Sequence, residues 1–200
     1  MISHKANTIF KEAILAYHLH DAIDQPIDNP YASHTIDHLL YLKCWIDTVQ
    51  WHMEDVVRDP KISAEKGLYW KRRIDASNQE RTDTVEYIDA YYFNLYKDVP
   101  AKPDAKINTE SLAWALDRLS ILALKIYHMK LEANRAEATE QHRKDCQLKL
   151  QILEHQQQDL SQSIDELMDD IQKGEKRIKV YKQMKMYNDP DLNPVLYDTK

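Results

Sequence analysis

Acidic side chains in the segment KRRIDASNQERTDTVEYIDAYY are the first residues whose spacing could support chemistry. At about 100° per residue, a helix over this segment places five polar residues within about 80° of arc. They are Asp75, Asn78, Thr82, Glu86 and Asp89. A solvent-exposed helix face usually mixes Lys with Glu four residues apart. Here three of the five side chains are acids, which repel one another unless a cation lies among them. The pattern favours a functional face, and a solvated acidic stripe is the structural alternative.

A second group of acids ends the preceding helix, in the run WHMEDVVRDP. A Glu-Asp pair on one helix and E-x-x-D on the next resemble all-α nucleoside triphosphate pyrophosphohydrolases, whose E-E-x-x-E and E-x-x-D motifs bind Mg²⁺. Arg58 stands where that family has its third acid. Mg²⁺ and Mn²⁺ take oxygen ligands and bridge to substrate phosphates. The resemblance implies that one of them is held by Glu54, Asp55, Glu86 and Asp89. The alternative is a surface Glu54–Arg58 ion pair worth about 0.5 kcal/mol.

Charges also lie inside the apolar segment TESLAWALDRLSILALKIYHMKL, which is hydrophobic on all sides and should form a central helix. Asp117 and His128 are eleven residues apart and fall within about 20° of each other. They are the candidate general-base pair, in which the Asp fixes the imidazole tautomer. Arg118 and Lys125 share a second face. Buried charges need partners on neighbouring helices, so a structural salt-bridge network and a polar pocket both remain open.

Two functional hypotheses follow, and the sequence leaves open whether the protein is an enzyme. The first is a metal-dependent enzyme acting on a phosphorylated small molecule, a nucleotide or sugar nucleotide, in a polar pocket between the second, third and fourth helices. Four cations would neutralise phosphate and an amide would orient the substrate. These substrate-binding candidates are Arg58, Asn78, Arg81, Arg118 and Lys125. The second hypothesis is a non-catalytic interaction or scaffold protein that uses a coiled coil to bind a partner.

Other kinds of site have little support in the sequence. With only two glycines, the chain contains no G-x-G-x-x-G and no P-loop motif. The histidines, including His18-x-His20, form no H-E-x-x-H or Glu-x-x-His pattern and are interpreted as surface or satisfied core residues. Cys44 and Cys146 are expected to be inert buried thiols.

The elements that must position these residues are helices, and the expected fold is all-α. Seven prolines separate the periodic segments. We expect an antiparallel bundle of five to six helices, the first three near 7–24, 35–58 and 62–96. From Leu153 onward apolar residues alternate three and four apart, which predicts a coiled-coil hairpin, and Gly174 is expected to cap or kink this helix. The single domain divides into bundle helices over 1–97, a linker over 98–108, a long helical hairpin over 109–187 and an extended strap over 188–200.

The balance of charge and hydropathy limits the partners. The net charge is −6, so no overall basic field attracts nucleic acid. No apolar run reaches the roughly 20 residues of a membrane span, and the N-terminus does not resemble a signal peptide. We therefore expect a cytoplasmic protein. Homo-oligomer formation through the hairpin is expected because its apolar seam exceeds what the fourth helix alone can cover.

Four long segments carry a second resemblance: WHMEDVVRDP, KRRIDASNQERTDTVEYID, INTESLAWALDRLSILALKIYHM and KVYKQMKMYNDPDLNPVLY. They are similar to a bacterial family, domain-of-unknown-function family 4254. The similarity extends from the second helix to the C-terminus. It implies a helical, cytosolic protein and supplies no activity, cofactor or site residue.

Overall fold

Five α-helices and one short 3₁₀ helix make up the computed structural model, which describes residues 1–186 and 189–199. They are α1 (Ile2–Tyr17), α2 (Ile36–Val57), α3 (Ala64–Tyr96), α4 (Leu112–Ala133), α5 (Glu140–Gln172) and η1 (Pro194–Thr199). Within the described residues there is no strand, and the one β-bridge joins Lys106 and Lys176. The predicted all-helical class is therefore confirmed. None of the described helices is long and apolar enough to cross a membrane.

Side-chain caps fix where four of the helices begin. In each case the hydroxyl of a Ser or Thr accepts a hydrogen bond from the backbone N–H three residues later. The capping residues are Thr35, Ser63, Ser111 and Thr139. Because the hydroxyl satisfies an N–H group that the helix itself leaves unpaired, each cap contributes about 1 kcal/mol to stability.

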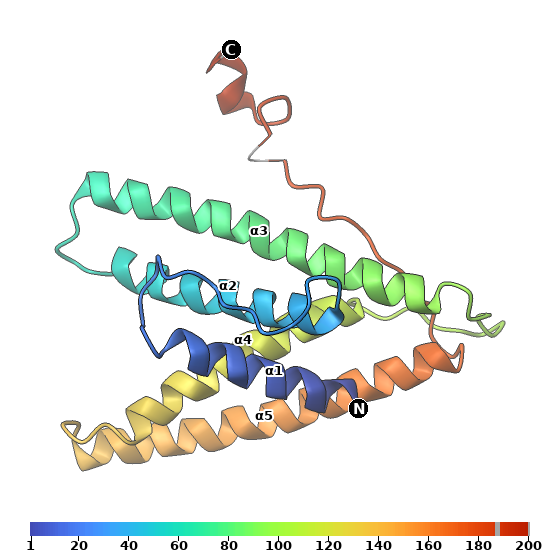
Figure 1. The fold of residues 1–200 in the computed structure, drawn as a ribbon, viewed down its shortest axis with the longest axis horizontal. Coiled ribbons are helices and arrows are strands. Elements are labelled where there is room, and N and C mark those ends of the chain that lie inside the picture. Colours follow the sequence, from blue (N-terminus) through green and yellow to red (C-terminus); the bar gives the residue numbers. More distant parts are fainter. Residues whose placement is uncertain (187–188, 200) are drawn as a thin grey trace.

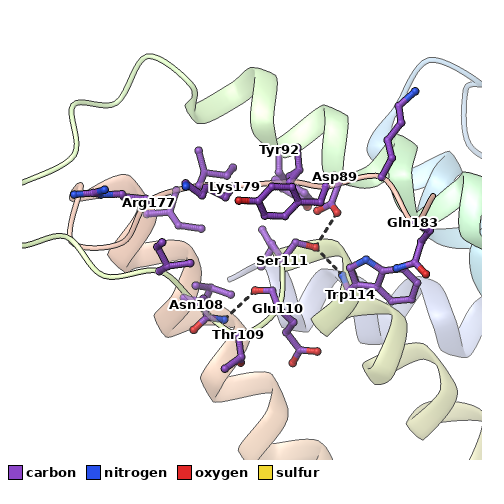
Figure 2. A pocket seen from close by; sticks show the side chains of 18 residues that line it. Asp89, Tyr92, Asn108, Thr109, Glu110, Ser111, Trp114, Arg177, Lys179 and Gln183 are labelled. Carbon is purple, nitrogen blue, oxygen red and sulfur yellow. Dashed lines mark hydrogen bonds between the residues drawn. The ribbon is translucent and has the colours of Figure 1, made fainter. Parts of the chain in front are cut away.

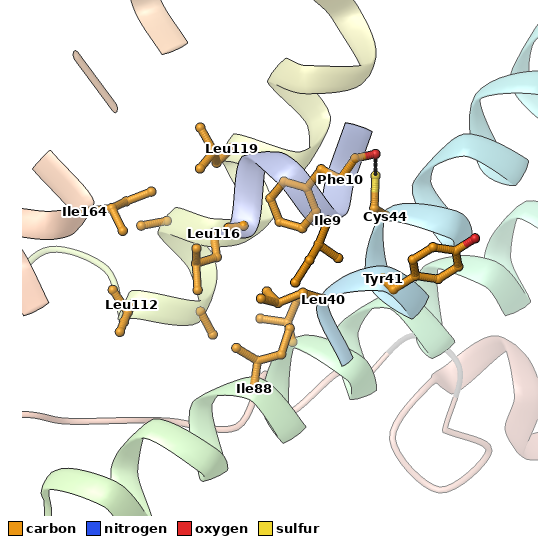
Figure 3. Packing of buried hydrophobic residues seen from close by; sticks show 14 of the residues in the cluster. Ile9, Phe10, Leu40, Tyr41, Cys44, Ile88, Leu112, Leu116, Leu119 and Ile164 are labelled. Carbon is orange, nitrogen blue, oxygen red and sulfur yellow. Dashed lines mark hydrogen bonds between the residues drawn. The ribbon is translucent and has the colours of Figure 1, made fainter. Parts of the chain in front are cut away.

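Helix α4 is the centre of the fold, as its all-round apolar sequence predicts. It packs against each of the other four α-helices. Figure 1 shows α4 crossing the other helices before the chain turns into α5. The core around α4 contains Ile9 of α1, Leu40 of α2, Ile88 of α3 and Ile164 of α5, together with Leu116 of α4 itself (Figure 3). Each fully buried side chain of this kind stabilises the fold by about 1.5–3 kcal/mol.

The apolar face of α5 is covered from within the chain by two helices. Ile164 and Leu167 of this face belong to the main hydrophobic core. On the α1 side, the backbone N–H and hydroxyl of Ser3 donate hydrogen bonds to the carboxylate of Asp165, at 3.0 and 2.5 Å. Helix α1 therefore supplies part of the cover that α4 does not give to this face.

Helix α5 ends at Gln172, well before residue 187, where the sequence pattern places its end. The helix ends just before Gly174, the residue that the sequence indicates as a cap or kink. Gly174 has a φ of +69°, and a Cβ at this position would overlap the carbonyl oxygen of Pro100. The positive φ turns the chain out of the helix, so Ile178 is not on a helix.

The C-terminal strap differs in part from its prediction. Pro194–Thr199 forms a 3₁₀ turn instead of extended chain, and residues 177–186, which the sequence assigns to the helical hairpin, have no regular secondary structure. Residues 188 and 200 of the predicted strap, and residue 187 at the end of the predicted hairpin, lie outside the described residues. The C-terminal turn stands away from the helices (Figure 1).

Candidate functional site

A cavity of about 400 Å³ lies between α2, α3 and α4. Its lining comes from one face of α2, one residue of α3 and two of α4: Asp47, Gln50, Trp51, Glu54, Asp55, Arg58, Arg81, Ile121 and Leu124. The α2 residues recur at three- and four-residue intervals, which places them on the same side of the helix. The volume is within the usual range for small-molecule sites.

The floor of this cavity is a buried ionic network. The Lys43 ammonium contacts Asp47 Oδ2 at 2.5 Å and Asp117 Oδ1 at 2.8 Å, and it donates to the Asp117 carbonyl at 3.0 Å. Arg81 binds the Asp117 carboxylate through two parallel hydrogen bonds of 3.0 and 2.7 Å. The Ser120 hydroxyl donates to Asp47 at 2.6 Å. Two cations thus face two carboxylates, so the network is electrically balanced.

The network holds Arg81 in a fixed orientation toward the cavity. Its side chain is 22% exposed, whereas the side chains of Lys43, Asp47 and Asp117 are 1–3% exposed. Burial acts to lower the pKa of Arg81, but the hydrogen bonds and charge of Asp117 raise it on balance. Burial raises the pKa of Asp47, although the Lys43 charge acts against this shift. Arg81 is therefore a permanently charged, pre-oriented group in the cavity wall.

The rim of the cavity carries a more exposed ion pair and an aromatic side chain. Arg58 contacts the Glu54 carboxylate at 2.5 Å, one helical turn away. Asp55 is exposed beside them. The ring of Trp51 lines the cavity and stacks on His128, with ring centroids 4.6 Å apart and planes 4° from parallel.

Several of the sequence-predicted residues come together in this cavity. Four of them line it: Glu54, Asp55, Arg58 and Arg81. Asn78 lies just behind, where its Oδ1 accepts a hydrogen bond of 3.0 Å from the side chain of Gln50. Asp117 does not line the cavity, but its carboxylate accepts a hydrogen bond from Arg81, which does.

The two acids Glu86 and Asp89 do not join this cavity. Asp89 is eight residues beyond Arg81, a distance of about 12 Å along the α3 axis. Its carboxylate accepts hydrogen bonds from the Ser111 hydroxyl at 2.8 Å and the Ala113 N–H at 3.4 Å, at the start of α4 (Figure 2). Burial raises the pKa of Asp89, while the Ser111 hydrogen bond opposes this shift. The predicted four-acid metal set is therefore not assembled.

A separate cavity of about 430 Å³ lies at the start of α4, where Asp89 accepts the hydrogen bonds from Ser111 and Ala113. Lys179 and Gln183, from the segment after α5, lie along its wall (Figure 2). The carboxylate of Glu86 accepts a hydrogen bond of 3.0 Å from the backbone N–H of Gln183. Glu86 thus holds the C-terminal segment against α3.

The predicted residues of α4 also separate. Arg118 and Lys125 are exposed and line a different cavity, between α4 and α5, and Arg118 pairs with Glu110 at 2.8 Å. Asp117 and His128 share a helix face but are about 16 Å apart along the axis. Asp117 is bound by Arg81 and Lys43, so it does not form a pair with His128.

Three histidines from three helices meet beside Trp51. His18 follows the last residue of α1, His52 is on α2 and His128 is on α4. Their possible ligand nitrogens all lie within 4.8 Å of one another, and each residue is half-buried. These imidazoles could hold a transition-metal ion. Burial lowers the pKa of His128 to about 4, with a further contribution from the other two imidazoles, and burial also lowers the pKa of His52.

Sequence reasoning missed this histidine cluster and half of the ionic network. The three histidines are far apart in the chain, and no local spacing connects them. Lys43 and Asp47 did carry a signal, because they are charges four residues apart inside the apolar run LLYLKCWIDTV. A charge inside an apolar helix needs a partner, and this reasoning, used above for the fourth helix, would have identified Lys43 and Asp47 as a buried pair.

The two cysteines are buried free thiols, as expected. Burial raises the pKa of Cys44 to about 12, and its Sγ lies 3.5 Å from the Phe10 carbonyl oxygen. A thiol with so high a pKa is not a nucleophile at neutral pH.

Comparison with known proteins identifies a family. Residues 37–180 match the family described as "Protein of unknown function (DUF4254)". The matched region contains every residue that lines the α2–α3–α4 cavity, together with His52 and His128, whereas His18 precedes it. No curated protein and no solved structure matches the chain. Because the match covers well over half of the 200 residues, the chain belongs to the DUF4254 family of proteins of unknown function.

Proposed function

We propose that the cavity between α2, α3 and α4 binds a phosphorylated small molecule, such as a nucleotide or sugar nucleotide, on which the protein acts as a metal-dependent enzyme. One observation carries this proposal. Four residues chosen for this chemistry from the sequence, Glu54, Asp55, Arg58 and Arg81, line one cavity of about 400 Å³ with Trp51.

Each part of the lining suits one part of such a ligand. Arg81, oriented by Asp117, and Arg58 at the rim offer planar guanidinium groups that match phosphate oxygens. The Trp51 ring offers an apolar surface for a base or sugar.

The charge of the lining supports a requirement for a divalent cation. Three acids and two arginines line the cavity, so a phosphate alone would meet a net negative surface. Glu54 and Asp55, neighbours in the sequence, both line the cavity, and Mg²⁺ is typically held by one or two carboxylates together with substrate phosphates. Bound there, Mg²⁺ or Mn²⁺ would neutralise the phosphate and polarise it.

A thermal-shift screen tests this proposal. The full chain is melted with nucleotides, sugar nucleotides and sugar phosphates, each with and without Mg²⁺, because a ligand of the native state raises the melting temperature. We expect a Mg²⁺-dependent rise that is lost in Arg58→Ala. Arg118→Ala is the matched control, since Arg118 is an exposed arginine paired with a glutamate elsewhere on the protein. A screen without shifts, or equal shifts in both variants, would reject the cavity as the site.

A scaffold function is the second candidate, favoured by an exposed apolar pair on α5. Leu148 and Ile152 are 61% and 59% exposed and lie one turn apart on the same face. Light scattering of the purified chain would reveal a homo-oligomer. An oligomer that dissociates in Leu148→Glu, but not in Leu95→Glu on α3, would support this face as its interface.

The buried free thiols of Cys44 and Cys146 support a cytoplasmic location, where a reducing environment keeps such residues unpaired.

A further inference from the structure

The packing of three helices creates a cluster of imidazoles that the cavity proposal does not use. Helices α1, α2 and α4 contact one another pairwise, and each contributes one histidine at the place where they meet. The Nε2 atoms of His18 and His52 are 3.3 Å apart. In a tetrahedral zinc site with Zn–N bonds of about 2.0–2.1 Å, two ligand nitrogens are separated by about 3.3–3.4 Å. One edge of such a tetrahedron is therefore already present.

The tautomer of His18 is the one that a metal ligand needs. Its Nδ1 lies 2.7 Å from the carbonyl oxygen of Ile14, so Nδ1 carries the proton and donates it to that oxygen. The lone pair of Nε2 is then directed toward His52. A hydrogen bond from the second ring nitrogen to a backbone carbonyl is the usual means by which proteins orient a metal-binding histidine.

His128 provides the observation that a purely structural cluster does not explain. A hydrogen bond between His52 and His18 would satisfy those two rings without a metal. The Nε2 atom of His128, however, is buried and has no hydrogen-bond partner among the residues that the structure describes. Leaving a buried nitrogen unsatisfied lowers the stability of the fold. A cation shared by the three rings would use this lone pair.

We propose that His18, His52 and His128 bind one divalent transition-metal ion, with Zn²⁺ as the best match. Imidazole nitrogens suit Zn²⁺ and its neighbours in the periodic table, whereas Mg²⁺ prefers oxygen ligands. This site is separate from the carboxylates at the cavity rim and needs no substrate, so it goes beyond the proposed function.

The carboxylate of Asp21 lies beside this site. Its Oδ1 is 3.5 Å from His52 Nε2, and the Asp21 side chain is 58% exposed. Three histidines with a solvent-accessible fourth position are typical of catalytic zinc sites, in which the metal-bound water has a lowered pKa. With an ion bound, Asp21 would supply a further oxygen ligand or a hydrogen-bond acceptor beside it. Trp51 stacks on His128 and also lines the cavity, so the two sites share a wall.

Metal titration of the full chain tests this site directly. The protein is stripped with a chelator, dialysed and titrated calorimetrically with Zn²⁺, and with Co²⁺ followed by visible absorption. We expect binding of one ion per chain, a tetrahedral Co²⁺ spectrum, and no heat from Mg²⁺ at the same concentrations. Adventitious binding by scattered surface histidines would give weak heats, more than one ion per chain and no tetrahedral spectrum, and would overturn the proposal.

Two variants keep the test independent of folding. His128→Phe retains a ring against Trp51 and removes the unsatisfied nitrogen, so the metal-free variant should melt at or above the wild-type temperature. We expect its Zn²⁺ affinity to fall at least about 100-fold, since even the loss of an outer partner costs 10–100-fold. His20→Ala, an exposed histidine two residues from His18, is the control and should bind as the wild type does. A folded His128→Phe with unchanged affinity would overturn the site, whatever the result of the substrate screen.

Discussion

Replacing Lys43 by Met is the sharpest test of the buried network. Met has nearly the same length and shape, but it removes the ammonium that contacts Asp47 and the side chain and carbonyl of Asp117. Two buried carboxylates would then share the single charge of Arg81. Breaking a buried ion pair from one side costs about 3–5 kcal/mol. We expect about 3 kcal/mol, because Arg81 still binds Asp117.

Equilibrium unfolding in urea at neutral pH measures this loss. Lys71→Met is the matched control, since Lys71 also pairs with an aspartate four residues later, but on the surface, with 57% of its side chain exposed. That change should cost less than about 1 kcal/mol. Adding Asp47→Asn to Lys43→Met restores the charge balance and should recover at least about 1 kcal/mol. If Lys43→Met costs no more than Lys71→Met, the network does not stabilise the fold and the reasoning fails.

The pH dependence of the same variant gives an independent check. Burial raises the folded-state pKa of Asp47, and Lys43 is the largest influence acting against that shift. Removing Lys43 therefore raises this pKa further. A carboxyl group whose pKa is higher in the folded than in the unfolded state takes up a proton on folding. Its stabilising effect is present at low pH and is lost as the pH rises through the folded-state value. The deficit of Lys43→Met should shrink as the pH is lowered from neutral, and a constant deficit would argue against charge repulsion.

Three further changes test the elements around the site. Asp89→Ala removes the acceptor of two hydrogen bonds at the start of α4 and should cost about 1–2 kcal/mol in urea unfolding, more than Asp89→Asn, which retains an acceptor oxygen. Gly174→Ala should lower stability by about 1–3 kcal/mol, because the added Cβ meets the Pro100 carbonyl at a positive φ; an unchanged melting temperature would mean that the turn after α5 can rearrange. Thr139→Ala removes the cap of α5 and should cost about 1 kcal/mol, whereas Thr139→Asp should not.

The helices could be predicted from the sequence wherever local signals set their limits. Helix α2 was expected over 35–58 and is observed over Ile36–Val57, because Thr35 caps it and Pro60 follows its end. Helix α1 was expected over 7–24 and is observed over Ile2–Tyr17, since its first residue has no side-chain cap to mark it. The prediction was accurate for α2, which has a side-chain cap, and inaccurate for α1, which has none.

The end of α5 has a local signal in Gly174, the residue expected to cap or kink this helix. The apolar spacing continues beyond Gly174 and places the end too late, whereas the close approach of Gly174 to Pro100, more than seventy residues earlier, has no signal in the sequence. A coiled coil for the hairpin stays a prediction, because the apolar face of α5 is shared between α4 and α1.

The buried part of the candidate site was predictable because a buried charge requires a partner. Asp117 in an apolar helix required a cation from a neighbouring helix, and Arg81 on α3 fills that role. An acid reaches the cavity only if it has both the right angle on the helical wheel and the right position along the axis of its helix. The wheel placed Glu86 and Asp89 with Asn78, but axial distance separates them from the cavity.

The buried ionic network and the His128 imidazole differ in whether their polar atoms have partners. The Lys43 ammonium has three partners and the network is balanced in charge, so it orients Arg81 without offering a free group of its own. The Nε2 atom of His128 is buried without a partner in the described chain. Most buried polar atoms in native proteins are satisfied. A chain that keeps an unsatisfied nitrogen beside two other imidazoles bears a cost that a bound cation would offset, so metal affinity, rather than stability, is the quantity that reports on what these histidines do.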